Sequence, residues 1–304
     1  MLSSFLVSWG ERLFFRPNFF DWVIIIFLTP LSLIYGSVML IRRVLSFSKK
    51  YPIPIVSVGN LTVGGSGKTP FVIALASRYQ DVAIISRGYK RESRGVVEVS
   101  RKGEVLTDVY QSGDEPMLMA KTLQYASVIV SEDRHLAIQL AIRQGAKLII
   151  LDDGFNRVDI KKFEILLFPK EIKNPMPFPA GSFREFFFLK YFADLNLKEG
   201  MDFKRVVTIE NPQERMLLVT AISNPQRLEP YLPDGVVGKI YLEDHAYFEE
   251  SVLLKEMKRL KATTLLVTEK DAVKMEGFSL ELSIMKLILE IDQDKLKKID
   301  HYVT

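Results

Sequence analysis

The clearest chemical signal in the sequence is a glycine-rich run over residues 59–76, GNLTVGGSGKTPFVIALA. Glycines allow backbone N–H groups to turn towards phosphate oxygens, and the N-terminus of a following helix adds a favourable dipole. Lys68 would reach the β- and γ-phosphates of a nucleotide, and the Thr69 hydroxyl would bind Mg²⁺. Thr62 stands where the strict pattern has its first glycine, and later glycines supply the flexibility. The expected nucleotide-binding residues are Thr62, Val63, Gly64, Gly65, Ser66, Gly67, Lys68 and Thr69.

A pair of acids, Asp152 and Asp153, follows the apolar run Lys147–Leu151. Four apolar residues in succession favour a strand covered on both faces, and ligands of parallel sheets bind at the C-terminal edge. One carboxylate would orient a Mg²⁺ water, and the other would contact metal or substrate. Two acids after an apolar run carry little weight alone, but the phosphate loop strengthens the prediction. Which of the two binds metal is left open.

The sequence favours ATP over GTP. Guanine-specific proteins with this loop usually carry Asn-Lys-x-Asp, and the chain has no such tetrapeptide. Thr268-Glu-Lys-Asp271 is superficially similar, but its Lys and Asp are adjacent, which is the wrong spacing for reading a base.

Composition excludes several classes of function. The chain of 304 residues has no cysteine, which excludes disulfides, cysteine-ligated zinc, iron–sulfur clusters and thiol catalysis. Residues 1–50 hold six basic side chains against two acidic ones, a surplus that equals the net charge of +4 of the whole chain. The rest is balanced, so a nucleic-acid-binding groove is not expected.

The N-terminal segment is apolar and then basic. Trp22–Ile41 contains no charged residue and, as a helix, would be about 30 Å long, close to one hydrocarbon thickness. Arginines 42 and 43 and lysines 49 and 50 follow, which places the remaining chain in the cytoplasm by the positive-inside tendency. A signal peptide and a buried core helix are the alternatives, and the pattern does not distinguish a spanning helix from one lying in a single leaflet.

Apolar runs alternate with helical patterns after residue 50, which predicts a parallel, right-handed α/β sheet. The pattern restarts near residue 216 as a smaller α/β unit, after a hinge expected near residues 200–212. We therefore expect three parts: a membrane-associated helix with its basic flank (1–50), a phosphate-loop core (51–205) and a smaller C-terminal α/β domain (206–304). The expected strands are 54–58, 82–86, 96–99, 128–131, 147–151, 165–168, 217–220, 239–242 and 264–268, and the expected helices are 70–79, 116–125, 133–144, 249–261 and 292–301.

Three further segments carry polar groups suited to an acceptor. SRGYKR (86–91) is a basic loop after a strand, and GDEP (113–116) puts two carboxylates at a helix start. PAGSFRE (179–185) is an irregular loop that runs into an aromatic cluster. Arginines in the first and third segments could bind a sugar phosphate in bidentate fashion. Helix capping by Asp114 and a core-edge position for Arg184 and the aromatic cluster are the structural alternatives.

Taken in order, these segments resemble the tetraacyldisaccharide 4'-kinase family, the lipid A kinases of Gram-negative bacteria. The resemblance rests on GNLTVGGSGKTP, SRGYKR, GDEP, SEDR, LDDGF, PAGSFRE, SNPQR, DH and VTEKDAVK behind a hydrophobic N-terminus. It covers about residues 22–275, and no single motif would identify the family. It implies ATP- and Mg²⁺-dependent phosphorylation of the 4'-hydroxyl of a tetraacylated glucosamine disaccharide 1-phosphate. It also implies a location at the cytoplasmic face of the bacterial inner membrane.

The resemblance assigns roles by motif position. Asp114 corresponds to the proposed catalytic base and His245 to the histidine that assists it, with Lys68 as the third catalytic residue. Glu115 joins Thr69, Asp152 and Asp153 near the metal. The residues expected to contact substrate are Arg87, Tyr89, Arg134 and Arg184. The chain departs from the family after Phe155, where Asn-Arg-Val replaces the usual Gln-His-Arg and the following Arg-Asp is missing.

The predicted protein is therefore a membrane-associated phosphate-loop kinase with a lipid substrate, and no protein partner or nucleic acid is expected. Two rivals remain open. One is a GTPase or metallochaperone on the same fold, which would bind guanine and carry a Cys/His metal motif. The other is a membrane adaptor that binds nucleotide without catalysis, in which Asp114 would be dispensable.

Overall fold

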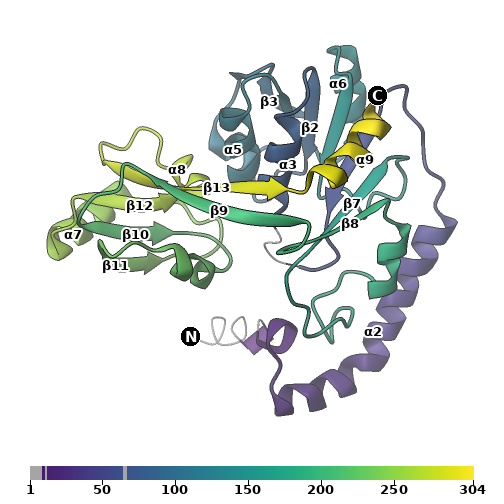
Figure 1. The fold of residues 1–304 in the computed structure, drawn as a ribbon, viewed down its shortest axis with the longest axis horizontal. Helices are drawn as coiled ribbons and strands as arrows, with labels where there is room; N and C mark the ends of the chain where they lie inside the picture. Colours follow the sequence, from purple (N-terminus) through teal and green to yellow (C-terminus); the bar gives the residue numbers. More distant parts are fainter. Residues whose placement is uncertain (1–8, 11, 64–66) are drawn as a thin grey trace. The chain divides into compact units, whose positions relative to one another are not determined.

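The computed structural model describes residues 9–10, 12–63 and 67–304. These residues form two compact units (Figure 1). Unit 1 comprises residues 1–68, 151–204 and 291–304, and unit 2 comprises residues 69–150 and 205–290. Each unit is built from segments far apart in the sequence. The three-part division expected from the sequence remains a prediction.

A long apolar helix, α2 (Phe19–Leu45), dominates the N-terminal part of unit 1 (Figure 1). It begins with a capping box, in which the Asn18 side chain accepts a hydrogen bond from the Asp21 backbone N–H and Asp21 accepts one from Asn18. The helix is long and apolar enough to cross a membrane, and only 17% of its most apolar stretch is buried. A buried core helix, one alternative from the sequence, does not fit this exposure.

One narrow face of α2 packs against the loop that carries PAGSFRE. Ser32 is buried and accepts a hydrogen bond from the Ala180 backbone at 2.8 Å. A Cβ at Gly36 would lie 2.6 Å from the Phe186 ring, so glycine permits this close approach. Much of the remaining helix surface is exposed, including Phe27 at 84%.

The strands of unit 1 lead into the phosphate loop and the acidic pair. β1 (Ile55–Gly59), β7 (Phe163–Phe168) and β8 (Leu195–Lys198) lie side by side in this order and are parallel. β6 (Leu148–Asp152) reaches unit 1 at its C-terminal end. The 3₁₀ helix η1 (Phe187–Phe192) carries the aromatic run, and α9 (Gln293–Val303) packs Tyr302 on Phe163. All residues of β1 and β6 are buried, as their apolar sequences predict.

The first half of unit 2 contains parallel strands and an antiparallel edge. β2 (Val82–Ser86) and β5 (Ser127–Val130) are parallel, whereas β3 (Val97–Arg101) runs antiparallel to β5, and β4 (Glu104–Val105) runs antiparallel to β3. The wholly parallel sheet predicted from the sequence differs from the structure here. Lys102 and Gly103 both have positive φ, the geometry of a tight two-residue hairpin, which accounts for the antiparallel pairing of β4 with β3. The helices of this half are α3 (Lys68–Ala76), α4 (Val109–Ser112), α5 (Asp114–Thr122) and α6 (Arg134–Arg143).

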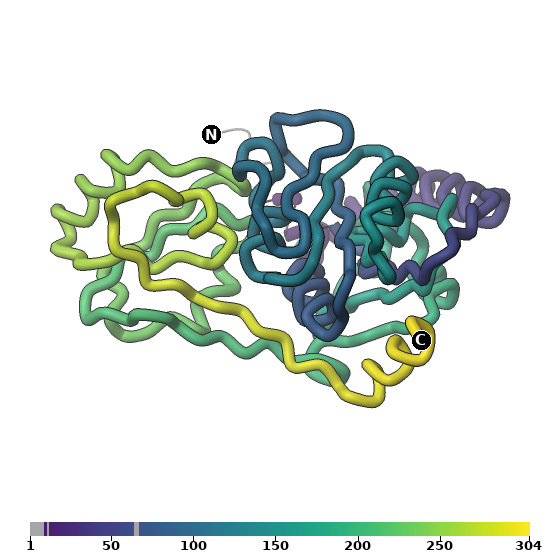
Figure 2. The backbone as a smooth tube through the Cα atoms, turned by 90° about the horizontal axis from the view of Figure 1, so that it is seen from above, coloured from purple at the N-terminus to yellow at the C-terminus, as the bar shows by residue number. Residues whose placement is uncertain are grey.

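The second half of unit 2 is a five-stranded sheet of order β11-β10-β12-β13-β9. Figure 2 shows the yellow strand β13 running beside the green strand β9. The expected hinge near residues 200–212 is largely strand β9, and β13 was also not expected. The strands are β9 (Phe203–Glu210), β10 (Met216–Thr220), β11 (Val236–Tyr241), β12 (Thr264–Thr268) and β13 (Leu282–Ile291), with η2 (Pro225–Tyr231), α7 (Glu250–Leu260) and α8 (Glu269–Ala272).

Candidate active site

In unit 1, the phosphate loop begins where the buried strand β1 ends. Asn60 follows the strand, is only 3% exposed, and accepts a hydrogen bond from Lys68 Nζ at 3.0 Å. Its amide also donates to Thr62 Oγ1 at 3.3 Å. The Val63 backbone donates to Ser182 O at 2.9 Å, which ties the loop to PAGSFRE. Asn60 thus orients the lysine, a role that the sequence reasoning missed although Asn60 lies inside the quoted motif.

The middle of the phosphate loop, Gly64, Gly65 and Ser66, lies outside the described residues. Gly67 has a φ of +80°, a conformation that favours glycine. Lys68 and Thr69 are the first two residues of α3, which places them at a helix N-terminus as predicted.

Asp153 is the acid that meets the loop lysine. Its carboxylate lies 3.6 Å from Lys68 Nζ and 2.8 Å from Arg184 Nη1. Burial would raise the pKa of Asp153, but the charges of these two cations outweigh it and hold that pKa below its ordinary value. Asp153 has a φ of +54°, which is unfavourable for a residue with a side chain, and its N–H donates to Val58 O. The backbone of Asp153 is therefore held in an unfavourable conformation while its carboxylate contacts Lys68 and Arg184.

The acidic pair of unit 1 suits Mg²⁺. Asp152 is buried at the end of β6 in this unit, whereas Thr69, buried at the start of α3, belongs to unit 2. No group of three metal-binding side chains occurs among the described residues. Mg²⁺ does not need one, because it usually takes one or two carboxylates together with waters and substrate phosphates. An ionised carboxylate beside the loop lysine meets that requirement.

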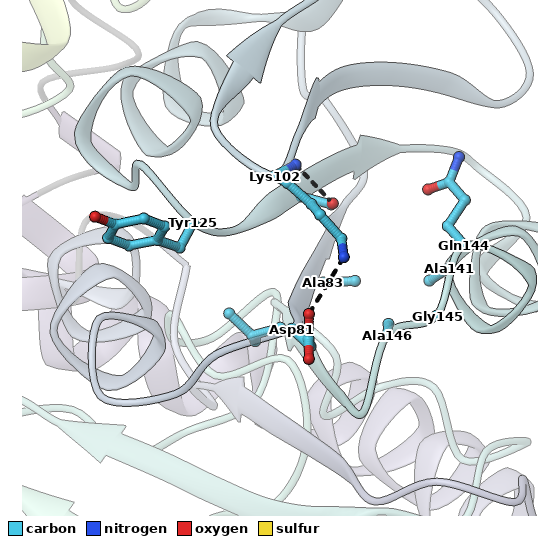
Figure 3. Close-up of a pocket in the computed structure, with 10 residues that line it drawn as sticks. Asp81, Ala83, Lys102, Tyr125, Ala141, Gln144, Gly145 and Ala146 are labelled. Atoms are coloured by element: carbon cyan, nitrogen blue, oxygen red, sulfur yellow. Dashed lines mark hydrogen bonds and ion pairs between the residues drawn. The ribbon is translucent and has the colours of Figure 1, made fainter.

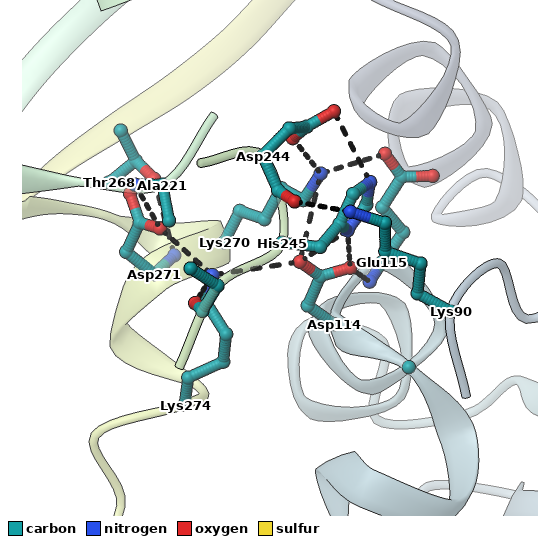
Figure 4. Close-up of polar contacts among 12 residues, drawn as sticks. Lys90, Asp114, Glu115, Ala221, Asp244, His245, Thr268, Lys270, Asp271 and Lys274 are labelled. Atoms are coloured by element: carbon teal, nitrogen blue, oxygen red, sulfur yellow. Dashed lines mark hydrogen bonds and ion pairs between the residues drawn. The ribbon is translucent and has the colours of Figure 1, made fainter. Parts of the chain in front are cut away.

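A second polar centre lies in unit 2, around Asp114 (Figure 4). Asp114 is the first residue of α5 and is 5% exposed, and His245 Nδ1 lies 2.8 and 2.9 Å from its two oxygens. An ionised carboxylate only accepts hydrogen bonds, so Nδ1 carries the hydrogen and donates it. His245 has a φ of +67°, and its backbone N–H donates to Ala221 O. The sequence placed these two residues in one site through family resemblance, and the structure brings them into contact.

Two lysines that the sequence did not assign to the site complete this centre. Lys270 Nζ lies 3.7 Å from Asp114, 3.2 Å from Glu115 and 3.9 Å from Asp244, and Lys274 Nζ lies 3.8 Å from Asp114 (Figure 4). Burial would raise the pKa of Asp114, but the hydrogen bond from His245 and these positive charges lower it below the ordinary value. Asp114 is therefore an ionised, buried acceptor at neutral pH.

The VTEKDAVK motif explains how the lysines are held. Asp271 is fully buried and accepts hydrogen bonds from Thr220 Oγ1 at 2.6 Å, Thr268 Oγ1 at 2.7 Å and the Ala221 backbone at 3.1 Å. Lys274 lies 3.2 Å from Asp271. Lys270 and Lys274 of this motif thus face the polar centre.

The residues expected to contact substrate are in different environments. Arg87 and Tyr89 are exposed, and the Tyr89 ring lies edge-on to His245 at 5.2 Å between centroids. Arg134 is buried and donates to Ser131 O. Arg184 is paired with Asp153, with 35% of its side chain exposed. Their contacts with substrate remain predictions.

A separate cavity in unit 2 is not a ligand site. It is lined by residues such as Lys102, Tyr125 and Gln144, with Lys102 Nζ 3.4 Å from Asp81 (Figure 3). Its volume is about 10 Å³. That is about the space of one water molecule, so no nucleotide or sugar fits.

Comparison with known proteins decides the family. The family model described as LpxK, tetraacyldisaccharide-1-P 4'-kinase, matches residues 24–199 and 189–303. The chain belongs to this family. The tetraacyldisaccharide 4'-kinase of Helicobacter pylori (strain HPAG1) is 48% identical over 295 residues, covering 96% of this chain and 94% of that protein. The enzyme of the same name from Aliarcobacter butzleri (strain RM4018) is 44% identical over 94% of this chain and 93% of its own.

A solved structure from the same family shares the fold. The crystal structure of LpxK from Aquifex aeolicus in complex with ATP superposes with a TM-score of 0.77 and 29% identity, covering 92% of this chain and 99% of that one. These findings confirm the family resemblance, the α/β phosphate-loop fold and the kinase activity predicted from the sequence. The roles of individual site residues stay predictions.

Proposed function

We propose that this kinase transfers the γ-phosphate of ATP to the 4'-hydroxyl of a tetraacylated glucosamine disaccharide 1-phosphate, in lipid A biosynthesis. The observation that carries the proposal is the buried Asp114 carboxylate, held by His245 Nδ1 at 2.8 Å. A sugar hydroxyl is a poor nucleophile, and a carboxylate that accepts its proton improves it. The names of the related proteins support the same acceptor.

In the proposed reaction, the 4'-oxygen attacks the γ-phosphorus and a new O–P bond forms. The bond between that phosphorus and the bridging oxygen of ADP breaks, and ADP carries away the electron pair. Asp114 accepts the proton of the hydroxyl. His245 donates to the carboxylate and holds it in one orientation, while Lys270 and Lys274 favour its ionised form.

The phosphate end of the reaction is assigned to the phosphate loop and the acidic pair. Lys68 would neutralise charge on the β- and γ-phosphates, with Asn60 fixing its ammonium group. Mg²⁺, held by Thr69, Asp152 or Asp153, with Glu115 as a further expected ligand, would polarise the phosphate and stabilise the charge that develops on it. Arg184 would orient Asp153 and keep an exposed edge for a substrate phosphate.

The lipid substrate requires access to a membrane. Helix α2 exposes a continuous apolar surface, with Ile26 at 69% and Phe27 at 84%. Arg42, which is exposed in the last turn of the helix, suits an anionic cytoplasmic leaflet. We therefore assign the protein to the cytoplasmic face of the bacterial inner membrane, where ATP and the lipid meet.

A direct assay tests the proposal. Purified protein is incubated in detergent micelles with ATP labelled at the γ-position, Mg²⁺ and the tetraacyldisaccharide 1-phosphate. We expect label in the lipid with ATP and much less with GTP. Asp114→Asn removes the proton acceptor, and Asp133→Asn is a matched control, because Asp133 caps α6 and asparagine caps equally well. A folded wild-type protein that binds ATP but leaves the lipid unlabelled would refute the kinase reaction and support the adaptor alternative.

A further inference from the structure

A buried ion pair joins the end of α2 to the loop that carries Arg184. Arg43 lies in the last turn of α2, and its guanidinium makes two hydrogen bonds with Glu185, both at 2.9 Å. The side chains are 7% and 6% exposed. A bidentate pair of this kind has one favoured geometry, so it fixes orientation as well as proximity.

The same guanidinium also holds the chain just after Asp153. Arg43 Nη2 donates to Phe155 O at 2.9 Å, and the guanidinium lies 3.9 Å from the Phe155 ring centroid. Phe155 is otherwise packed among Leu61, Leu166, Phe168 and Phe183. Arg43 therefore contacts the residue two positions after Asp153 and the residue next to Arg184.

Asp153 needs such support. Its positive φ is an uncommon conformation for a residue with a side chain, and such a conformation persists only when its surroundings enforce it. Arg43 holds two segments, one at Phe155 and one at Glu185. The ion pair of 2.8 Å between Asp153 and Arg184 joins the same two segments. Loss of Arg43 would free both segments and let the carboxylate relax away from Lys68.

We propose that Arg43 is a positioning residue: with Glu185 and the Phe155 carbonyl it fixes the Asp153–Arg184 pair, so the end of helix α2 sets the geometry of the nucleotide site. The inference rests on the proposed role of Asp153 at the nucleotide phosphates. In this proposal α2 positions the nucleotide site in addition to its proposed contact with lipid.

The test must separate positioning from simple stability. Arg43→Met breaks the pair and leaves Glu185 buried without its partner, which destabilises the protein. Arg43→Met combined with Glu185→Leu removes both charges, and such replacements are often neutral for stability. The double variant still lacks the donor to Phe155 O, so it isolates the positioning role.

We expect the double variant to recover the unfolding midpoint of wild type, while ADP binding in Mg²⁺ buffer, measured by calorimetry, stays weaker by about ten-fold. The KM for ATP should rise by a similar factor, and the KM for the lipid should not change. Arg42→Met is the matched control, because Arg42 lies in the same turn of α2 but is exposed, and its guanidinium donates to Asn156 O and not to Glu185 or Phe155. It should leave ADP binding at the wild-type level.

Arg43→Lys guards against a double variant that fails to fold. It keeps the positive charge beside Glu185 but cannot make the forked contact, so ADP binding should again fall by about ten-fold. Wild-type ADP binding in either folded variant would overturn the inference and leave Arg43 as an anchor of α2 only. The ADP measurement needs no lipid, so its outcome is separate from any failure of the wild-type protein to label the lipid.

Discussion

Replacing Asp114 with asparagine is the sharpest test of the polar centre in unit 2. Asparagine has nearly the same size and can still accept a hydrogen bond from His245 Nδ1 through its amide oxygen. It cannot accept a proton at neutral pH, so the change removes the chemistry and keeps the shape. Lys270 keeps Glu115 as a partner and Lys274 keeps Asp271, so neither cation is left without a counter-charge.

The expected magnitudes differ between rate and stability. General base catalysis contributes about 10²- to 10⁴-fold, so kcat should fall by that factor, or about 3–5 kcal/mol in the activation barrier. The free energy of unfolding should fall by only about 1–3 kcal/mol, the cost of weakening a buried charged hydrogen bond. The KM for ATP should stay within about three-fold of wild type, because Asp114 is assigned to the acceptor hydroxyl and not to the nucleotide.

His245→Gly completes a double-variant cycle. Glycine tolerates the positive φ of His245 and carries no side chain, so the backbone is kept while the Nδ1 hydrogen bond is lost. We expect about a ten-fold or greater fall in kcat for this variant, and a double variant no slower than Asp114→Asn alone, because residues that act as a unit are not additive. The assay is initial-rate phosphorylation of the lipid, with circular dichroism to verify folding. A folded Asp114→Asn protein with more than a tenth of the wild-type kcat, or additive losses in the cycle, would refute the assignment.

Three further predictions concern stability and membrane contact. A Cβ at Gly59 would lie 2.8 Å from the Phe155 Cβ. Gly59→Ala should therefore lower the free energy of unfolding by about 1–3 kcal/mol, measured with urea. An unchanged unfolding midpoint would contradict this packing. Burial raises the pKa of Glu164 to about 6 from 4.5, so the folded state favours the protonated carboxyl. The stability that this preference contributes is full below pH 4.5 and is lost as the pH rises through 6. Glu164→Gln should therefore flatten the dependence of the unfolding free energy on pH between 4.5 and 6, and a slope equal to that of wild type would count against the buried assignment. A double variant, Ile26→Ser with Phe27→Ser, should bind anionic vesicles at least about ten-fold more weakly in a sedimentation assay, because both side chains are exposed apolar surface. Binding equal to that of wild type would argue against α2 as the membrane contact.

Local sequence was sufficient for the elements around the phosphate loop. The apolar runs that become β1, β2 and β6 were placed within one or two residues, because fully buried strands leave a continuous apolar signature. β9 and β13 were missed for the opposite reason. Both strands mix polar and apolar residues and are only partly buried, so their sequences carry no such signature.

The antiparallel edge shows a different limit. Lys102 and Gly103 form a two-residue hairpin turn, and the alternation of strands and helices along the sequence carries no sign of it. Once the turn forms, β4 must pair antiparallel with β3, whatever the direction of the other strands.

The sequence by itself determined the phosphate loop and the apolar helix, because each lies in a contiguous segment whose chemistry can be read from neighbouring residues. The kinase family and the pairing of Asp114 with His245 followed from the ordered set of motifs that resembles the family. Only the tertiary structure decided which charges surround the pair and what holds Asp153. His245 is 131 residues from Asp114 and Arg43 is 142 residues from Glu185 along the chain. Contacts at such separation are selected by packing and charge compensation in the folded state, and no local pattern in the sequence encodes them.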